Sequence, residues 1–169
     1  MEHDGFEQAA REHKDRIFSY AAMMLRDPEE ARDVSQDALV RLWRNWSKVD
    51  DRGVRTWLLR TTHNLCIDRI RRRKVRSEVD GEEVIPMQPD EAPGPGQLAE
   101  SGELGQIIAT ALGSLSEIDR AVVVMREVQR MPYDEIARTL KVPLGTLKAR
   151  LHRARERLRG KLDRAGVAP

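Results

Sequence analysis

Residues 133–157 read YDEIARTLKVPLGTLKARLHRARER, and no other part of the sequence is as informative about its fold. The pattern predicts a short helix over residues 133–140, a turn that contains Pro143 and Gly145, and a longer basic helix from Thr146. The small side chain of Ala137 permits a close crossing of the two helices. This order of elements is the helix-turn-helix arrangement, whose second helix enters the major groove of DNA.

The second helix of the pair separates apolar from basic residues. Its apolar residues recur at steps of four, three and four, which defines one packing face: Leu147, Leu151, Ala154 and Leu158. Its other residues are left to face outward: Lys148, Arg150, His152, Arg153, Arg155 and Arg157. Lys and Arg in the major groove bind guanine edges or neutralise phosphates. The alternative is a surface helix whose arginines only keep the protein in solution.

An apolar helical stripe precedes this pair. Its members recur at three- and four-residue steps: Leu104, Ile107, Ile108, Ala111, Leu112 and Leu115. Ser116 and Asp119 then resemble a capping box in which Asp replaces the usual Glu. The apolar run 122–125 has strand propensity, but the cap before it favours a buried helix. We therefore predict a helical domain over residues 103–164.

The first 76 residues also have a helical pattern. One stripe extends from Phe6 to Leu25. Asp27 and Pro28, followed by two glutamates, mark the start of the next helix, because Asp caps helices and Pro suits the first helical position. That helix extends to about Trp46, and a third is expected from about residue 55 to 74. The sequence thus predicts an all-α fold, with a second small helical domain over residues 6–76.

Composition excludes several classes of protein. The 169 residues are 40% apolar, which is enough for a core, but no run approaches the roughly 20 apolar residues of a membrane span. The N-terminus lacks the pattern of a secretory signal. The single Cys66 cannot form an internal disulfide, and the four histidines are too far apart in sequence to suggest a local metal site. We expect a cytoplasmic protein without a metal ion or cofactor.

Charge is segregated along the chain, although the formal net charge is only +2. Residues 41–76 contain twelve Lys or Arg and three acids, and residues 138–164 contain ten and two. Residues 77–103 contain eight acids and no Lys or Arg. Two basic blocks favour two sites for a polyanion over two merely solvated faces. The acidic stretch is rich in Pro and Gly, so residues 77–102 are expected to be a flexible acidic linker.

Three motifs resemble those of one family. The first motif is residues 27–43, which read DPEEARDVSQDALVRLW. The second begins with residues 57–60, which read WLLR, and continues with Asn64, Asp68 and the basic run 71–73. The third is the stretch 133–155. In this order and spacing the sequence resembles the extracytoplasmic-function (ECF, group IV) sigma factors of bacterial RNA polymerase. Their two helical domains are called region 2 and region 4. The resemblance covers nearly the whole chain except the linker.

The resemblance implies three sets of site residues. Core polymerase is expected to bind the second helix through Asp33, Gln36, Asp37, Leu39 and Trp43. The −10 promoter element is expected to be recognised and opened by Asp50, Asp51, Arg52, Gly53, Arg60, His63, Asn64, Arg71, Arg72, Arg73 and Lys74. The −35 element is expected to be read by Thr146, Lys148, Ala149, Arg150, His152, Arg153 and Arg155. We expect Trp57 to belong to the core rather than to stack on a base.

The resemblance also implies partners. These are core RNA polymerase, promoter DNA and a separate, often membrane-anchored anti-sigma factor, while the acidic linker is expected to thread through basic channels of the polymerase. The sequence departs from the family pattern at Ser35, at Thr61 and Thr62, at Ser116, and at Pro132, which takes the usual capping position before Tyr133. These departures leave the expected fold intact, but the family pattern does not then predict the fine promoter preference of this chain.

Two other functions remain to be weighed. A stand-alone helix-turn-helix regulator that binds operator DNA explains residues 133–157, but it leaves the second helix and the first basic block without a purpose. Such regulators also tend to be symmetric dimers on palindromic sites. An enzyme is disfavoured, because the sequence shows no nucleophile–base set, no phosphate-binding glycine loop and no metal cluster.

Overall fold

The computed structural model describes residues 2–80 and 102–167, which lie in two compact units. The N-terminal unit comprises Met1–Gln88 and the C-terminal unit comprises Pro89–Pro169. The described residues form helices and turns, without a strand, so the predicted all-α fold is confirmed. The flexible linker was expected over residues 77–102, but residues 77–80 continue a helix and Gly102 begins the next one, while residues 81–101 lie outside the described residues.

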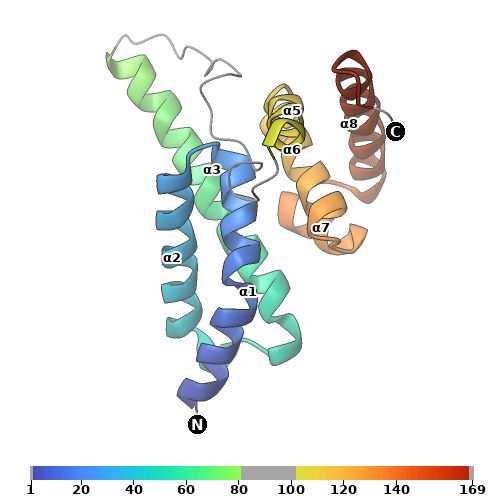
Figure 1. Ribbon diagram of the computed structural model, residues 1–169. Coiled ribbons are helices and arrows are strands. Elements are labelled where there is room, and N and C mark those ends of the chain that lie inside the picture. Colours follow the sequence, from blue (N-terminus) through green and yellow to red (C-terminus); the bar gives the residue numbers. More distant parts are fainter. Residues whose placement is uncertain (1, 81–101, 168–169) are drawn as a thin grey trace. The chain divides into compact units, whose positions relative to one another are not determined.

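The N-terminal unit is built from three packed helices (Figure 1). Helix α1 packs against both α2 and α3, and α2 packs against α3. The elements are α1 (Glu2–Leu25), α2 (Pro28–Arg44), the 3₁₀ turns η1 (Trp46–Lys48) and η2 (Asp51–Gly53), and α3 (Val54–Asp80). Ile17, Tyr20 and Leu42 are among the fully buried side chains that hold the three helices together.

The start of α2 confirms the predicted capping. The Asp27 carboxylate accepts hydrogen bonds from the backbone N–H groups of Glu29 (2.9 Å) and Glu30 (3.3 Å). Pro28 occupies the first turn, where its missing N–H needs no partner. Replacing such a cap with Ala typically costs about 1 kcal/mol.

Helix α3 is longer than the sequence pattern predicted. It continues past Lys74 to Asp80, because Gly81 is the first Gly or Pro of the sequence after residue 74. Two polar residues at apolar positions of the family pattern are buried without loss of hydrogen bonds. The Ser35 hydroxyl donates to the Ala31 carbonyl (2.7 Å), and the Thr62 hydroxyl donates to the Leu58 carbonyl (2.7 Å).

The C-terminal unit contains the predicted helix-turn-helix pair, although its second helix begins at Leu144 rather than Thr146, so Gly145 lies in the helix and not in the turn. Its elements are α5 (Gly102–Gly113), α6 (Glu117–Val123), the π-helical turn η3 (Val124–Val128), α7 (Tyr133–Leu140) and α8 (Leu144–Arg164). Helix α8 packs against α5, α6 and α7. The Ser116 hydroxyl accepts a hydrogen bond from the Asp119 N–H (3.3 Å), as predicted for a cap. The run 122–125 is helical and buried, which also agrees with the prediction, although its second half is π-helical.

Candidate nucleic-acid and protein interfaces

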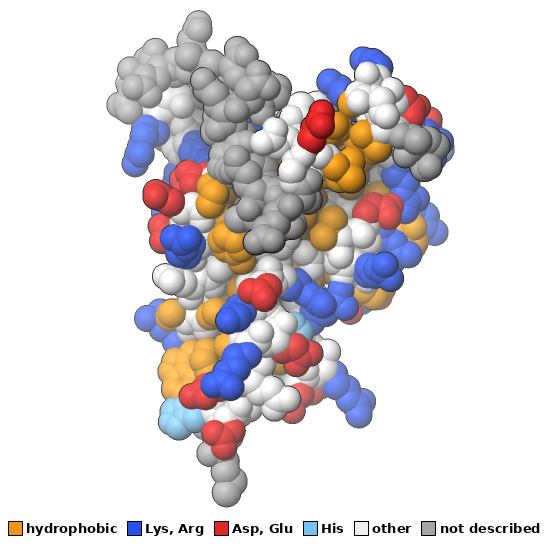
Figure 2. All heavy atoms as spheres, in the orientation of Figure 1, with side chains coloured by type: hydrophobic (Ala, Val, Ile, Leu, Met, Phe, Trp, Pro, Cys, Tyr) orange, Lys and Arg blue, Asp and Glu red, His pale blue; other side chains and the backbone are white. Residues whose placement is uncertain are grey.

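Helix α8 presents an exposed polar face opposite its packing face. Leu147, Leu151 and Ala154 are buried, as the sequence predicted. The outward-facing residues with exposed side chains include Thr146, Lys148, Ala149, His152 and Arg153. Figure 2 shows Lys and Arg side chains gathered over this helix. A face of this kind suits the major groove, where small and basic side chains approach base edges.

Two arginines of α8 do not belong to this free face. Arg150 is only partly exposed, and its guanidinium is paired with the Asp119 carboxylate at 3.1 Å. Arg155 is paired with the Glu127 carboxylate at 2.5 Å, and this hydrogen bond raises the pKa of Arg155. The structure thus differs from the expectation that both arginines are free to read DNA, because acids from α6 and η3 already hold them.

Helix α3 carries a second exposed polar stripe. Arg60, Asn64 and Arg71 are exposed and lie at steps of four and seven residues, which places them on one side of the helix. At 1.5 Å per residue the stripe is about 17 Å long, which spans about five stacked bases. Spacing and exposure therefore fit contact with several nucleotides.

His63, which was expected to bind DNA, does not belong to that exposed stripe. Its side chain is buried, and Nδ1 shares a hydrogen bond of 2.8 Å with the Tyr20 hydroxyl of α1. Burial lowers the pKa of His63 to about 4, so the imidazole is neutral near pH 7. The imidazole thus faces Tyr20 in the core of the unit rather than the exposed side of the helix.

The basic run 71–74 is divided by the rotation of the helix. Arg71, Arg72 and Lys74 are exposed, whereas Arg73 points into the unit. Arg73 forms an ion pair with Glu30 and donates a hydrogen bond to the Leu25 carbonyl (3.1 Å). It therefore ties α3 to the end of α1 and the start of α2, whereas the sequence led us to expect a contact with DNA.

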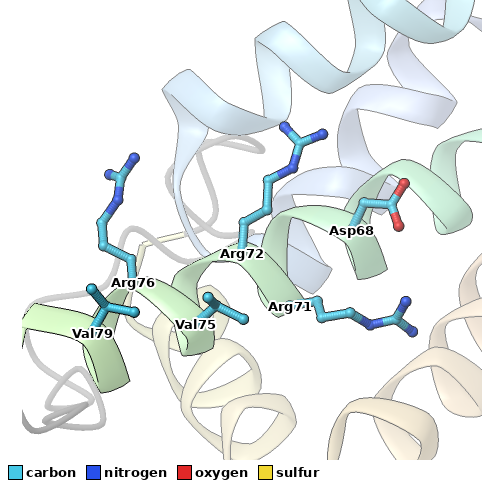
Figure 3. Close-up of a pocket in the computed structure, with 6 residues that line it drawn as sticks. All are labelled: Asp68, Arg71, Arg72, Val75, Arg76 and Val79. Atoms are coloured by element: carbon cyan, nitrogen blue, oxygen red, sulfur yellow. The ribbon is translucent and has the colours of Figure 1, made fainter.

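The C-terminal half of α3 also lines a pocket (Figure 3). The described residues around it all come from successive turns of this helix: Asp68, Arg71, Arg72, Val75, Arg76 and Val79. Arg76 was not among the predicted site residues, although it lies just beyond the basic run 71–74 and could have been included on that ground. Val75 and Val79 are exposed, so this surface combines positive charge with apolar area.

The loop before α3 is exposed and folded into a short turn. Asp50, Asp51 and Arg52 have exposed side chains, and Gly53 is partly exposed. The Asp50 carboxylate accepts a hydrogen bond from the Arg52 N–H (3.3 Å), which orders the turn. Trp57, expected in the core, is only partly buried one turn into α3.

Helix α2 presents a third exposed surface. Asp33 and Gln36 are exposed, while Asp37 and Leu39 are partly exposed. Val40 is 46% exposed and lies one turn beyond Gln36, so it belongs to this surface although it was not among the expected site residues. The Asp37 carboxylate pairs with Arg41 at 3.5 Å, a contact between two solvated side chains.

An aromatic cluster borders the α2 surface. Trp43 is 43% exposed, stacks on His3 with ring centroids 4.9 Å apart, and meets the edge of Phe6 at 5.0 Å. Trp46 also contacts Phe6, at 5.8 Å. In Figure 2 hydrophobic side chains gather beside a histidine near the N-terminal end of α1. No local pattern indicates that His3 and Phe6 contact Trp43, because both lie far from it in sequence.

Two negative findings apply to residues 2–80 and 102–167 alone. They contain no group of three or more His, Cys, Asp or Glu side chains that could hold a metal ion. None of their helices is both long and apolar enough to cross a membrane.

Comparisons with known proteins agree with the two-part architecture. Residues 9–76 match the family model described as Sigma-70 region 2, and residues 105–158 match the one described as Sigma-70, region 4. Both the α2 and α3 surfaces fall within the first match, and the helix-turn-helix pair falls within the second. The chain therefore has the two domains of a sigma factor.

Curated relatives identify the family more closely. The chain is 34% identical to the ECF RNA polymerase sigma factor SigW of Bacillus subtilis, over 94% of this chain and 89% of that protein. It is also 34% identical to the ECF RNA polymerase sigma factor SigE of Mycolicibacterium smegmatis, over 91% of this chain, but it spans only 60% of that relative. The chain belongs to the ECF RNA polymerase sigma factors. Sigma factors are DNA-binding initiation factors rather than enzymes.

Solved structures show the same fold. The sigma factor RpoE of Bartonella quintana, in complex with the anti-sigma factor NepR, matches with a TM-score of 0.77 at 23% identity, over 94% of this chain and 96% of that one. CnrH, in complex with the cytosolic domain of CnrY, matches with a TM-score of 0.62 at 26% identity, over 94% of this chain and 87% of that one.

Proposed function

We propose that the chain is a group IV sigma factor that binds core RNA polymerase and directs promoter-specific initiation in the cytoplasm. The observation that carries this proposal is the presence of separate exposed surfaces on α2, α3 and α8, within a chain of the ECF family. One DNA-binding surface would suffice for an ordinary regulator. Three surfaces provide one contact each for the polymerase, the −10 element and the −35 element.

The α2 surface is proposed to bind core polymerase. Trp43 and Val40 supply exposed apolar area, and Asp33 and Gln36 supply polar groups beside it. Protein interfaces commonly combine an aromatic anchor with a polar rim. Leu39 and Asp37, both partly exposed, complete this proposed surface.

The exposed side of α3 and the loop before it are proposed to bind the opened −10 element. Arg60, Asn64 and Arg71 line one side of the helix, and the loop over residues 50–53 stands at its start. A flipped base costs a few kcal/mol of lost stacking, which polar contacts in a pocket offset. Arg72 and Lys74 extend the positive surface toward the backbone of the DNA.

Helix α8 is proposed to read the −35 element as a duplex. Lys148 and Arg153 have charged ends that reach guanine edges or phosphates, while Ala149 leaves room for a base edge between them. Thr146 and His152 lie on the same exposed part of the helix. Residues 6–76 and 103–164 are the proposed functional domains, joined by residues 77–102.

An anti-sigma factor is proposed as a further partner. The RpoE structure that resembles this chain was solved with an anti-sigma factor bound. Such a partner would cover the exposed α2 and α8 surfaces. It would thereby prevent the chain from binding the polymerase and the promoter.

Core binding provides a direct test of the α2 surface. The full chain is labelled with a fluorophore and titrated with purified core polymerase, and its anisotropy gives the dissociation constant. Trp43→Ala and Gln36→Ala are expected to weaken binding at least tenfold, as for anchors near the centre of an interface. Glu7→Ala, at an exposed position of α1, is the control and should bind normally. Equal affinity of all four proteins would contradict the proposed surface.

The stand-alone regulator is not favoured by the comparisons. It does not account for the match of residues 9–76 to region 2 or for the α2 surface. A stand-alone regulator would also occupy its DNA site to the same extent with and without core polymerase. The anisotropy of the same labelled chain, titrated with DNA, measures this occupancy.

A further inference from the structure

Two ion pairs connect α8 to α6 and η3, the two elements before the helix-turn-helix. Arg150 pairs with Asp119 of α6, and Arg155 pairs with Glu127 of the π-helical turn η3. The partners are 31 and 28 residues apart in sequence. Both pairs therefore fix the recognition helix relative to α6, against which it packs.

The two arginines lie on opposite edges of the packing face. In an α-helix each residue advances about 100°, so residues five apart differ by about 140°. Leu151 and Ala154 lie between Arg150 and Arg155 around the helix, and both are buried. A pair on each edge opposes rotation of α8 about its own axis in either direction. Leucine packing alone resists such rotation less well, because apolar contacts have no direction.

The π-helical turn explains how both acids reach α8. Asp119 and Glu127 are eight residues apart, which in a regular α-helix would separate them by about 80°. In η3 the Gln129 N–H donates to the Val124 carbonyl (2.9 Å), five residues earlier. The extra residue in this turn rotates Glu127 back toward the side of Asp119. Such turns are frequent at functional positions of helices.

The residue before Glu127 anchors this turn from the other side. The Arg126 guanidinium donates to the Met131 carbonyl (2.9 Å) and lies 4.1 Å from the centroid of the Tyr133 ring. Tyr133 is the first residue of α7. The turn is thus held to the start of α7, while Glu127 holds α8. Both helices of the DNA-binding pair are positioned from η3.

We propose that Arg150 and Arg155 are positioning residues, held by Asp119 and Glu127, that set the rotation of α8 and leave base reading to Lys148, Ala149, His152 and Arg153. The inference rests on the proposed function of α8. The basic residues of this one helix would then have two different roles, positioning and base reading, which the sequence alone does not distinguish. Removal of Arg150 or Arg155 changes how well the helix discriminates between base pairs, and it leaves the number of phosphates that the helix neutralises unchanged.

The first experiment observes the Arg155 pair without any promoter. In the full chain, the Nε–H of a paired arginine exchanges slowly with water and gives a resolved NMR signal. Glu127→Gln should accelerate exchange of the Arg155 Nε–H, which donates to Glu127, at least tenfold. The Arg150 Nε–H is buried and lies outside the pair with Asp119, which is made through Nη1, so its exchange should not change. Unchanged exchange at Arg155 in this variant would overturn the pair as a positioning device.

The second experiment measures discrimination with holoenzyme assembled from core polymerase and the full chain. Binding is compared between a promoter fragment and the same fragment with a scrambled −35 element, over a range of salt concentrations. Arg155→Gln and Glu127→Gln should each reduce the ratio of affinities about tenfold, with an unchanged salt slope. The matched variant Arg153→Gln removes a cation from the face that contacts DNA, so it should lower the salt slope by about 0.9 as well as the ratio of affinities.

Exchange of the paired charges distinguishes position from contact. Glu127→Arg combined with Arg155→Glu restores the pair but removes the cation at position 155, so discrimination should recover to within threefold of the original chain. Failure to recover, together with a salt slope lowered by about one in Arg155→Gln, would make Arg155 a DNA contact and overturn the inference. If the original holoenzyme itself shows no discrimination, the proposed function fails, and the NMR experiment still decides the pairing.

Discussion

At the scale of single residues, burial separates polar side chains that look equivalent in the sequence. His63 and Asn64 are neighbours in a basic helix, yet only Asn64 is exposed. The rotation of about 100° per residue turns His63 toward Tyr20 of α1. Local sequence could not decide between the two, because the partner of His63 is 43 residues away.

The buried His63 makes stability depend on pH. Its pKa falls from 6.5 to about 4 on folding, because burial disfavours the charged imidazole. Between pH 6.5 and pH 4, His63 is therefore protonated in the unfolded chain but neutral in the folded chain. The free energy of unfolding falls as the pH falls through this range. The full effect is about 3 kcal/mol. Urea unfolding of the original chain and His63→Gln, at pH 7.5 and pH 4.5, measures it.

The variant supplies the control for that measurement. His63→Gln lowers stability at pH 7.5, but it lacks the titrating group, so its loss of stability between the two pH values should be smaller by about 2–3 kcal/mol. Identical losses in both proteins would show that His63 is not the group responsible.

Cys66 is the other buried titratable residue of this helix. Its side chain is fully buried, and burial raises the pKa of the thiol. Only the thiolate reacts readily, so Cys66 should be inert toward a thiol reagent such as DTNB in the folded chain and react fully in 6 M guanidinium chloride. Fast reaction of the folded chain would contradict its role in packing.

At the scale of elements, caps and turns decide where helices begin and end. Lys141 closes α7 in the left-handed conformation, with φ 57° and ψ 46°, which costs a residue with a side chain about 1 kcal/mol or more. Lys141→Gly should therefore raise the free energy of unfolding by about 0.5–1 kcal/mol, despite the greater freedom of Gly in the unfolded chain. Thermal unfolding followed by circular dichroism measures this change.

A glycine placed inside the same helix is the matched control. Arg138→Gly should lower stability by about 1 kcal/mol, because Gly is unfavourable in a helix interior and the contact of Arg138 with Asp134 is lost. A destabilising Lys141→Gly would mean that the lysine side chain contributes more than its backbone strain costs.

Helix starts could be predicted from sequence, whereas the use of each basic side chain could not. The caps at Asp27 and Ser116 involve partners only two or three residues away, so a local pattern contains them. Arg73, Arg150 and Arg155 bind partners 28 to 48 residues away. The basic blocks therefore revealed the kind of ligand but overstated the number of side chains that are free to bind it.

At the scale of the whole molecule, the described chain forms two units with separate cores. The N-terminal core includes the fully buried Leu42 and Leu58, and the C-terminal core includes Met125, Ile136 and Leu147. The separation follows the two matches to sigma-factor regions. The sequence pattern predicted both cores because the apolar stripes of their helices are regular.

Separate cores predict separate responses to core mutations. Leu42→Ala should destabilise the N-terminal unit by about 2–5 kcal/mol, because it leaves a cavity among α1, α2 and α3. Amide hydrogen exchange in the full chain should then increase in residues 2–80 and stay within twofold of the original in residues 102–167. Leu147→Ala is the reciprocal variant. Equal acceleration in both units would contradict their independence.

Run-off transcription tests the central claim most directly. Purified core polymerase is supplied with fragmented genomic DNA, with and without the full chain, and transcript starts are mapped. We expect discrete starts that require the chain and share two sequence elements at a fixed spacing. They should disappear with Trp43→Ala, through loss of polymerase, and with the double variant Lys148→Ala and Arg153→Ala, through loss of −35 contacts. Binding of the chain to duplex DNA without any such starts would contradict the account and make it a stand-alone regulator.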